Sequence, residues 1–91
     1  MSEVNKTLHR VLLLNDDQTP MDFVAYVLEK FFHMRADAAR ELMLRVHNEG
    51  SADCGTYPHD EAAQLVADVV SFAREYKHPL QCVMQAKGTN P

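Results

Sequence analysis

The stretch from Leu12 to Val24, LLLNDDQTPMDFV, constrains the fold of this chain more than any other. An apolar run ends abruptly at three adjacent polar residues, Asn15, Asp16 and Asp17, and Thr19-Pro20 then opens an amphipathic pattern. Asn and Asp favour turns because their side chains hydrogen-bond to the local backbone. The pattern predicts a strand that ends in a polar turn and passes into a helix. We interpret this junction as a binding site for a cationic group attached to an apolar one.

The size and composition of the chain indicate one globular domain. With 91 residues there is room for a single modest core, which we expect over residues 9–86, between a flexible segment 1–8 and a frayed C-terminus 87–91. The net charge of −4 argues against a nucleic-acid partner. The sequence has neither a signal core nor an apolar run near the ~18 residues that a membrane span requires, so we expect a cytoplasmic protein without a membrane partner. Cys54 and Cys82 lack zinc-ligand spacing and are expected to be reduced, buried thiols.

Hydrophobic periodicity predicts six elements. The continuous apolar run in residues 9–14 predicts a strand buried on both faces. Thr19 is the predicted N-cap and Pro20 the first position of a helix that ends at Phe32. A second helix is expected from about Ala36 to just before Gly50, a third over residues 60–76, and further strands over residues 51–57 and 80–86. The order β-α-α-β-α-β predicts a single-domain α+β fold, with a three-stranded, mostly antiparallel sheet and helices packed on one face.

The candidate chemistry lies in the acidic turn and in one histidine. When ionised, Asp16 and Asp17 are acceptors, and Asn15 adds an amide oxygen. His47 lies four residues after Met43, so we expect it to be partly buried, with a neutral imidazole that offers one acceptor nitrogen. A plain polar turn and a space-filling histidine remain alternatives. The other histidines are expected at the surface, and Met21, Met34 and Met43 could fill the core or line an adaptable pocket.

Catalysis and metal binding have little support in the sequence. The motifs G-x-S-x-G and D-x-D-x-D-G are absent, and so is a glycine-rich phosphate loop. A metal-dependent hydrolase that uses Asp16, Asp17 and His47 stays open as an alternative, but we expect no enzyme activity, no bound metal and no cofactor.

Four segments of the chain resemble the ClpS family. VLLLNDDQTPMDFV, VLEKFF, ELMLRVHNEG and HPLQCVM occur in this order at compatible spacing, over about residues 11–84. The resemblance implies a small, monomeric, non-enzymatic adaptor. Such an adaptor binds proteins or peptides with a destabilising first residue (Leu, Phe, Tyr or Trp) and delivers them to a ring-shaped ClpA-type AAA+ unfoldase for proteolysis.

The resemblance also assigns residues to the site. It implies that Asn15, Asp16, Asp17 and His47 hold the α-amino group of the substrate, and that Met21 screens out β-branched first side chains. The pocket for the first side chain would consist of Leu13, Thr19, Met21, Val24, Met43, Val46 and Leu80. An α-ammonium has three donors and no acceptor, so acceptors beside an apolar pocket suit it.

Two departures concern delivery to the unfoldase. The family commonly carries a longer flexible arm before the first strand than the one here. At the start of the third helix, Asp60 and Glu61 fall on positions that touch the unfoldase, but Pro58 replaces a hydroxyl residue and Leu65 replaces a basic one. The alternative is therefore a ClpS-like protein-interaction domain with an altered unfoldase or cargo preference.

Overall fold

The computed structural model describes residues 7–87 and has the predicted order of elements. The strands are β1 (Leu8–Leu14), β2 (Ser51–Pro58) and β3 (Gln81–Ala86). The helices are α1 (Met21–Phe32), α2 (Ala36–Glu49) and α3 (His59–Glu75). The predicted α+β fold is confirmed, with element ends within one or two residues of those expected. The terminal segments 1–6 and 88–91, predicted to be loose, lie outside the described residues.

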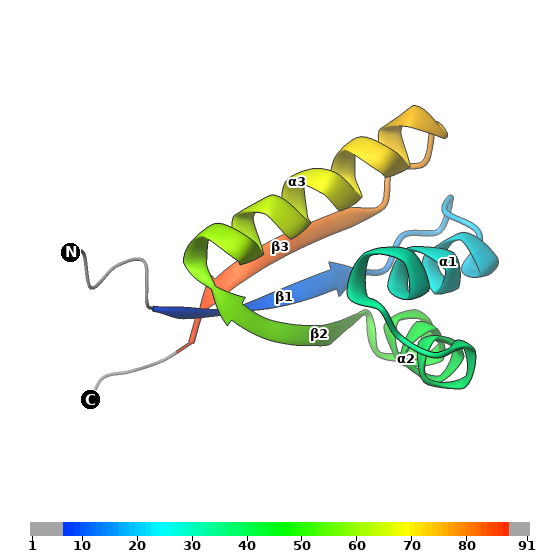
Figure 1. The fold of residues 1–91 in the computed structure, drawn as a ribbon. Helices are drawn as coiled ribbons and strands as arrows, with labels where there is room; N and C mark the ends of the chain where they lie inside the picture. The colour runs from blue at the N-terminus through cyan, green and yellow to red at the C-terminus, as the bar shows by residue number, and fades with distance from the viewer. Residues whose placement is uncertain (1–6, 88–91) are drawn as a thin grey trace.

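The sheet has the order β2-β1-β3, and β1 is antiparallel to both neighbours. In Figure 1, α3 runs along the sheet while α1 and α2 gather at the far end of β1. Along β1, Val11 and Leu13 are fully buried, whereas Leu12 and Leu14 are partly exposed. The prediction that this strand is buried on both faces is wrong. The helices cover one face, and an antiparallel sheet can leave its other face to solvent.

The helices bury the apolar stripes that periodicity predicts. Fully or nearly buried side chains come from α1 (Val24, Val27, Leu28, Phe32), from α2 (Ala39, Met43, Val46) and from α3 (Ala62, Val69, Ala73). They pack with Val11, Leu13, Ala52, Cys54, Leu80 and Cys82 into one core. Each of these leucine or valine side chains contributes roughly 1.5–3 kcal/mol on burial.

A bulge in β2 shapes the sheet opposite Val11. Val11 pairs with Gly55 and Leu12 pairs with Asp53, so Cys54 is the extra residue. Gly55 has φ +142°, and a Cβ atom there would lie 2.8 Å from the Tyr57 hydroxyl oxygen. The Asp53 carboxylate accepts the Gly55 N–H at 2.9 Å. Glycine is therefore required at this position by both the backbone and the neighbouring ring.

Candidate functional site

The acidic turn is held against the end of α2 by backbone hydrogen bonds. The Asn15 N–H donates to the Gly50 carbonyl at 2.8 Å, and the Gly50 N–H donates to the Val46 carbonyl at 2.9 Å. Gly50 caps α2 in the left-handed conformation, φ +93°, as predicted. The residues after β1 and the last turn of α2, which carries His47, therefore meet at one end of the molecule.

Asp16 organises the loop from within. Its two carboxylate oxygens accept hydrogen bonds from the Thr19 hydroxyl and from the Gln18 N–H. These bonds lower the pKa of Asp16, with the Thr19 hydroxyl as the main cause, so this carboxylate stays ionised. Each oxygen keeps a second lone pair with which to accept a further donor.

The Thr19 hydroxyl does not cap α1. Pro20 is the N-cap, and α1 has no side-chain cap hydrogen bond, so the predicted roles of Thr19 and Pro20 are wrong. The physical reason is that Pro20 keeps an extended backbone, φ −63° and ψ 146°, and its carbonyl accepts the N–H groups of Phe23 and Val24, so the helix begins one residue later than predicted. The buried Thr19 side chain therefore fixes the loop and not the helix.

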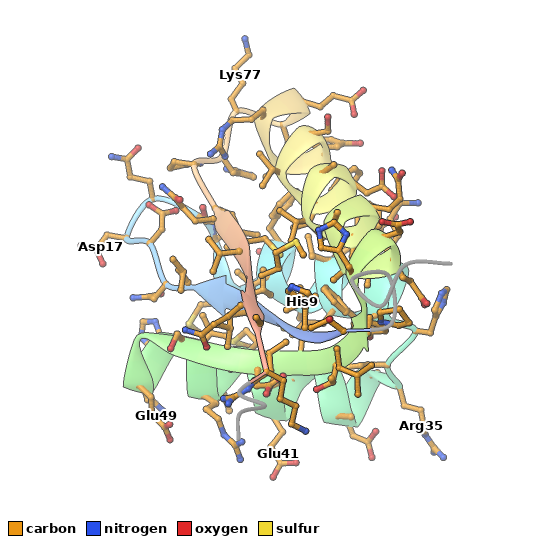
Figure 2. The ribbon with its side chains drawn as sticks, turned by 90° about the vertical axis from the view of Figure 1, so that its left-hand side faces the viewer. His9, Asp17, Arg35, Glu41, Glu49 and Lys77 are labelled. Carbon is orange, nitrogen blue, oxygen red and sulfur yellow. The ribbon has the colours of Figure 1, made fainter. Side chains whose placement is uncertain are left out.

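Three further candidate acceptors are exposed at the same end. Asn15, Asp17 and His47 all lie at the surface, and Asp17 projects away from the loop in Figure 2. Within residues 7–87, their side chains have no hydrogen-bond or ion-pair partner. His47 lies on the solvent side of α2, next to the buried Val46, so the alternative of a partly buried, space-filling histidine is wrong. All three side chains are free to meet a ligand.

Five of the predicted pocket residues belong to the buried core and are called here the apolar floor of the candidate site: Leu13, Val24, Met43, Val46 and Leu80. The exposed fraction is 0% for Leu13 and Leu80 and 1% for Val46. It is below 9% for Thr19, Val24 and Met43, which are also buried. Met21, at the first turn of α1, is 41% exposed. Among the predicted pocket residues Met21 is therefore the one exposed to solvent, and its flexible side chain can move aside.

Two of these residues, Met21 and Met43, line a groove of about 620 Å³ between α1 and α2. Its other lining residues are Asp22, Ala25, Glu29, Ala36, Asp37, Arg40 and Leu44. Asp37 is drawn toward Arg35 at 3.9 Å, an exposed pair that contributes little to stability. With three carboxylates and one arginine around an apolar base, the groove suits a ligand that is apolar and positively charged.

The residues implied in unfoldase contact lie at the opposite end of the molecule. Leu8, the first residue of β1, pairs with Pro58, and α3 begins at His59. Asp60 is paired there, since its carboxylate accepts from His59 Nδ1 at 2.9 Å. The ring of His59 also contacts the ring of His9, with centroids 5.1 Å apart. The length of β1 thus separates Asp60 and Glu61 from the acidic turn.

Sequence reasoning missed an aromatic cavity on the other side of α1. It is lined by Phe23 and Tyr26 from α1, by Phe72 from α3 and by Tyr76, the C-cap of α3. His78, expected at the surface, packs its ring edge against Phe23 with centroids 4.4 Å apart. The signal was present in the sequence, because each pair of aromatic residues is spaced three or four positions apart on a helix.

The two cysteines are buried free thiols, as predicted. Burial raises the pKa of Cys54 and that of Cys82 to about 12, so neither forms a reactive thiolate at neutral pH. Over residues 7–87, no group of three or more His, Cys, Asp or Glu side chains is arranged to hold a metal ion. None of the helices in that range has the length and apolar character needed to cross a membrane.

Comparison with known proteins gives the family. The profile described as ATP-dependent Clp protease adaptor protein ClpS matches residues 5–83. The chain belongs to the ClpS family. It is 58% identical to the ClpS of Aromatoleum aromaticum over 78 residues, 86% of this chain and 76% of that protein. It is 54% identical to ClpS 2 of Rhodopseudomonas palustris over 80 residues, 88% of this chain and 73% of that protein.

A solved ClpS structure has the same fold. The structure of Agrobacterium tumefaciens ClpS2 bound to L-phenylalaninamide matches with a TM-score of 0.88 at 33% identity, over 90% of this chain and 99% of that one. The family predicted from the sequence is thereby confirmed. ClpS proteins are adaptors of the Clp protease and are not themselves catalytic enzymes.

Proposed function

We propose that this chain binds the free α-amino group and the bulky hydrophobic first side chain of N-degron substrates, and that it delivers them to a ClpA-type AAA+ unfoldase in the cytoplasm. The observation that carries the proposal is the set of unpartnered acceptors, Asn15, Asp17 and His47, at the edge of a buried apolar floor. The chain would act as a monomer and without a cofactor.

The ligand of the related ClpS2 supports this reading. L-Phenylalaninamide has a free α-amine, a phenylalanine side chain and an amide in place of the next peptide bond. It therefore presents the two groups that the candidate site would distinguish, one for the acceptors and one for the floor.

The acceptors suit an α-ammonium in number and kind. Its three N–H donors would be met by the Asn15 amide oxygen, by the carboxylates of Asp16 and Asp17 directly or through water, and by a neutral His47 nitrogen. Each charge-assisted hydrogen bond contributes on the order of 1.5–3 kcal/mol. Since Asp16 is already held by Thr19, its charge is fixed in place before the ligand arrives.

The apolar floor adds the second half of the affinity. Burial of a leucine or phenylalanine side chain contributes ~1.5–3 kcal/mol. The sum of both halves, less the costs of ordering, reaches about −8 kcal/mol, which corresponds to a micromolar Kd. Neither half alone suffices, so the site would require both a free amine and a large apolar first residue. Met21, exposed at its entrance, would exclude side chains branched at Cβ.

A panel of fluorescent peptides tests the first-residue preference. Peptides that begin with Leu, Phe, Tyr or Trp should bind with Kd values of about 1 μM, and an Ala-first peptide of otherwise identical sequence should bind at least about tenfold more weakly. In the Met21→Ala variant, Val-first and Ile-first peptides should gain affinity while Leu-first peptides lose little. Equal affinities for the Ala-first and Phe-first peptides would rule out the apolar floor as a recognition element.

Delivery requires a separate test, because the start of α3 departs from the family pattern. Asp60 is occupied by His59, and Leu65 stands where a basic residue is expected. Degradation of a Phe-first fluorescent protein by a ClpA-type protease should accelerate on addition of the chain. Normal peptide binding without acceleration would favour the alternative, a ClpS-like interaction domain with a different unfoldase or cargo preference.

A further inference from the structure

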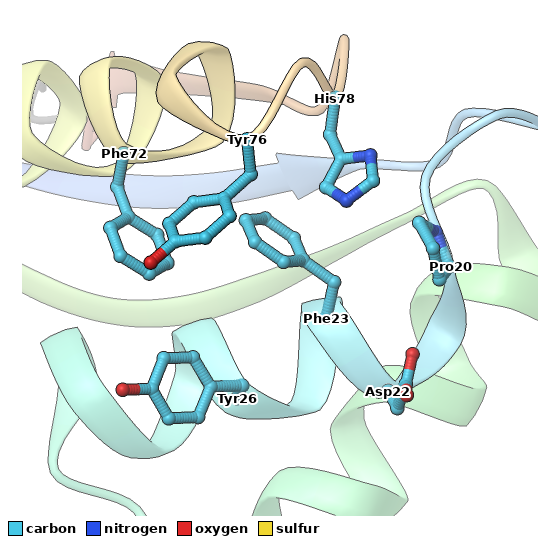
Figure 3. A pocket seen from close by; sticks show the side chains of 7 residues that line it. All are labelled: Pro20, Asp22, Phe23, Tyr26, Phe72, Tyr76 and His78. Atoms are coloured by element: carbon cyan, nitrogen blue, oxygen red, sulfur yellow. The ribbon is translucent and has the colours of Figure 1, made fainter.

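A cavity of about 440 Å³ opens between α1 and the end of α3, and of its lining residues only Asp22 also lines the groove that contains Met21 and Met43. Figure 3 shows Phe23 reaching from α1 toward Phe72 on α3 and Tyr76 at its C-cap, while Tyr26 extends along α1 below them. Asp22 and Pro20 lie at one end of this aromatic cavity, and the ring of His78 lies above Phe23.

The inner rings of the aromatic cavity have a structural task. Phe23 stacks on Phe72 with centroids 5.4 Å apart and ring planes 13° apart, and both side chains pack against the core. Phe31 adds an edge contact to Phe72, with centroids 5.3 Å apart. These rings hold α1 against α3 and account for the burial of Phe23 and Phe72.

The two tyrosines are not explained by packing. Tyr26 is 50% exposed and Tyr76 is 56% exposed. Each touches Phe72, with centroids 5.9 Å and 4.9 Å apart, but each leaves ring surface open beside the cavity. Aromatic surface kept in water around a hollow is typical of a recognition site and adds little to the core.

Aromatic rings and an exposed carboxylate at this cavity suit a cationic group. Aromatic faces attract positive charge, and the Lys30 ammonium already lies 5.8 Å from the centroid of Phe72 and 5.7 Å from that of Phe31. The exposed Asp22 carboxylate at the end of the cavity has no ion-pair partner within the part of the chain that the structure describes. An apolar or proline-rich occupant would desolvate this carboxylate without pairing it.

We infer that the aromatic cavity binds the cationic side chain of a lysine or arginine at an internal position of a polypeptide partner. The exposed rings of Tyr26 and Tyr76 would face the cation, since the Phe72 ring already stacks on Phe23 and contacts Lys30, and Asp22 would supply the opposite charge. Because an internal side chain carries no α-amine, this site operates independently of Asn15, Asp17 and His47.

The test is an NMR titration with Nα-acetyl-arginine amide, with Nα-acetyl-citrulline amide as the uncharged analogue of the same shape. Neither compound has a free α-amine, so the outcome does not depend on the proposed N-degron site. The arginine compound should shift the ring resonances of Tyr26, Phe72 and Tyr76 along a saturable curve, with a Kd on the order of 1 mM. The citrulline compound should bind at least about fivefold more weakly, since it lacks the charge.

Variants locate the effect. Tyr26→Ala and Tyr76→Ala should each weaken arginine binding about threefold, and Asp22→Asn should do the same by removing the counter-charge. Leu8→Ala is the matched control, because Leu8 is 45% exposed at the opposite end of β1, and this variant should bind as the unchanged chain does. Equal shifts with arginine and citrulline, an absence of saturation, or affinity unaffected by the tyrosine variants would overturn the inference.

Discussion

Polar side chains lie near the surface at both ends of β1, in the acidic turn at one end and at the start of α3 at the other. The two ends differ in whether these side chains already have hydrogen-bond partners. At the start of α3, His59 donates to Asp60 and packs against His9, whose Nδ1 in turn donates to the Thr7 carbonyl at 3.1 Å. At the acidic turn, Asn15, Asp17 and His47 have no side-chain partner among the described residues. The acidic turn also follows the buried Leu13, and His47 follows the buried Val46. The difference indicates where a small charged ligand can gain hydrogen bonds without first breaking others.

The largest expected effect is at the acidic turn. Asp17→Ala and His47→Ala should each weaken the binding of a Phe-first peptide by about tenfold or more, because each removes an acceptor from the ammonium. Glu49→Gln is the matched control, since Glu49 is exposed at the same end of α2 but is outside the candidate site. Fluorescence anisotropy measures the affinities. An equal loss in the control variant would mean that general charge, and not these acceptors, attracts the peptide.

His47→Gln should weaken peptide binding by a smaller factor than His47→Ala. Glutamine keeps an acceptor oxygen for the ammonium, so the affinity should fall only about threefold. Fluorescence anisotropy with the same Phe-first peptide measures this loss. A loss in His47→Gln as large as that in His47→Ala would contradict the role of His47 as an acceptor.

Changes at the start of α3 should affect delivery and leave peptide binding alone. Asp60→Asn and Glu61→Gln should raise the KM for degradation of a Phe-first protein about threefold, as expected for exposed charges at an interface. Glu75→Gln, at the other end of the same helix, is the control. If Asp60→Asn weakened binding of the isolated peptide instead, the assignment of separate tasks to the two ends of β1 would be wrong.

The smallest expected effect concerns the hydrogen bond from Thr19 that holds Asp16 in the acidic turn. Thr19→Val removes the hydroxyl that lowers the pKa of Asp16, so this pKa should rise toward the ordinary value of about 3.9. A lowered folded-state pKa contributes stability above the ordinary value, and the contribution is lost as the pH falls through the folded-state pKa. The free energy of unfolding of the variant should therefore differ most from that of the unchanged chain near neutral pH. Carboxyl NMR titration and denaturant unfolding at two pH values measure both quantities, and an unchanged Asp16 pKa would contradict the role of Thr19.

The sequence predicted the fold well because its local signals agree. Apolar stripes at helical spacing mark α1, α2 and α3, and Gly50 ends α2 as expected. Two errors arose where tertiary context decides. The continuous apolar run of β1 suggested burial on both faces, but a run of leucines cannot reveal that helices cover one side alone. Thr19 matched the N-cap pattern, yet Pro20 keeps an extended backbone and its carbonyl accepts the first helical N–H groups, so α1 begins at Met21.

The candidate site was predicted less completely than the fold. The sequence and its family resemblance named the acceptors and the floor, but the exposure of His47 depends on the rotation of α2 about its axis and was missed. The aromatic cavity was missed because Phe23 and Phe72 belong to separate helices that are far apart in the sequence. Periodicity identifies the face that each helix buries, but it does not say which helices meet.

The free α-amine is the central claim, and one pair of affinities tests it most directly. Two Phe-first peptides of identical sequence, one with a free N-terminus and one Nα-acetylated, are compared by anisotropy against the unchanged chain at neutral pH. The acetylated peptide keeps the phenyl side chain but loses the ammonium, so it should bind at least about tenfold more weakly. Equal affinity of the two peptides would contradict the claim that Asn15, Asp17 and His47 recognise an α-amine.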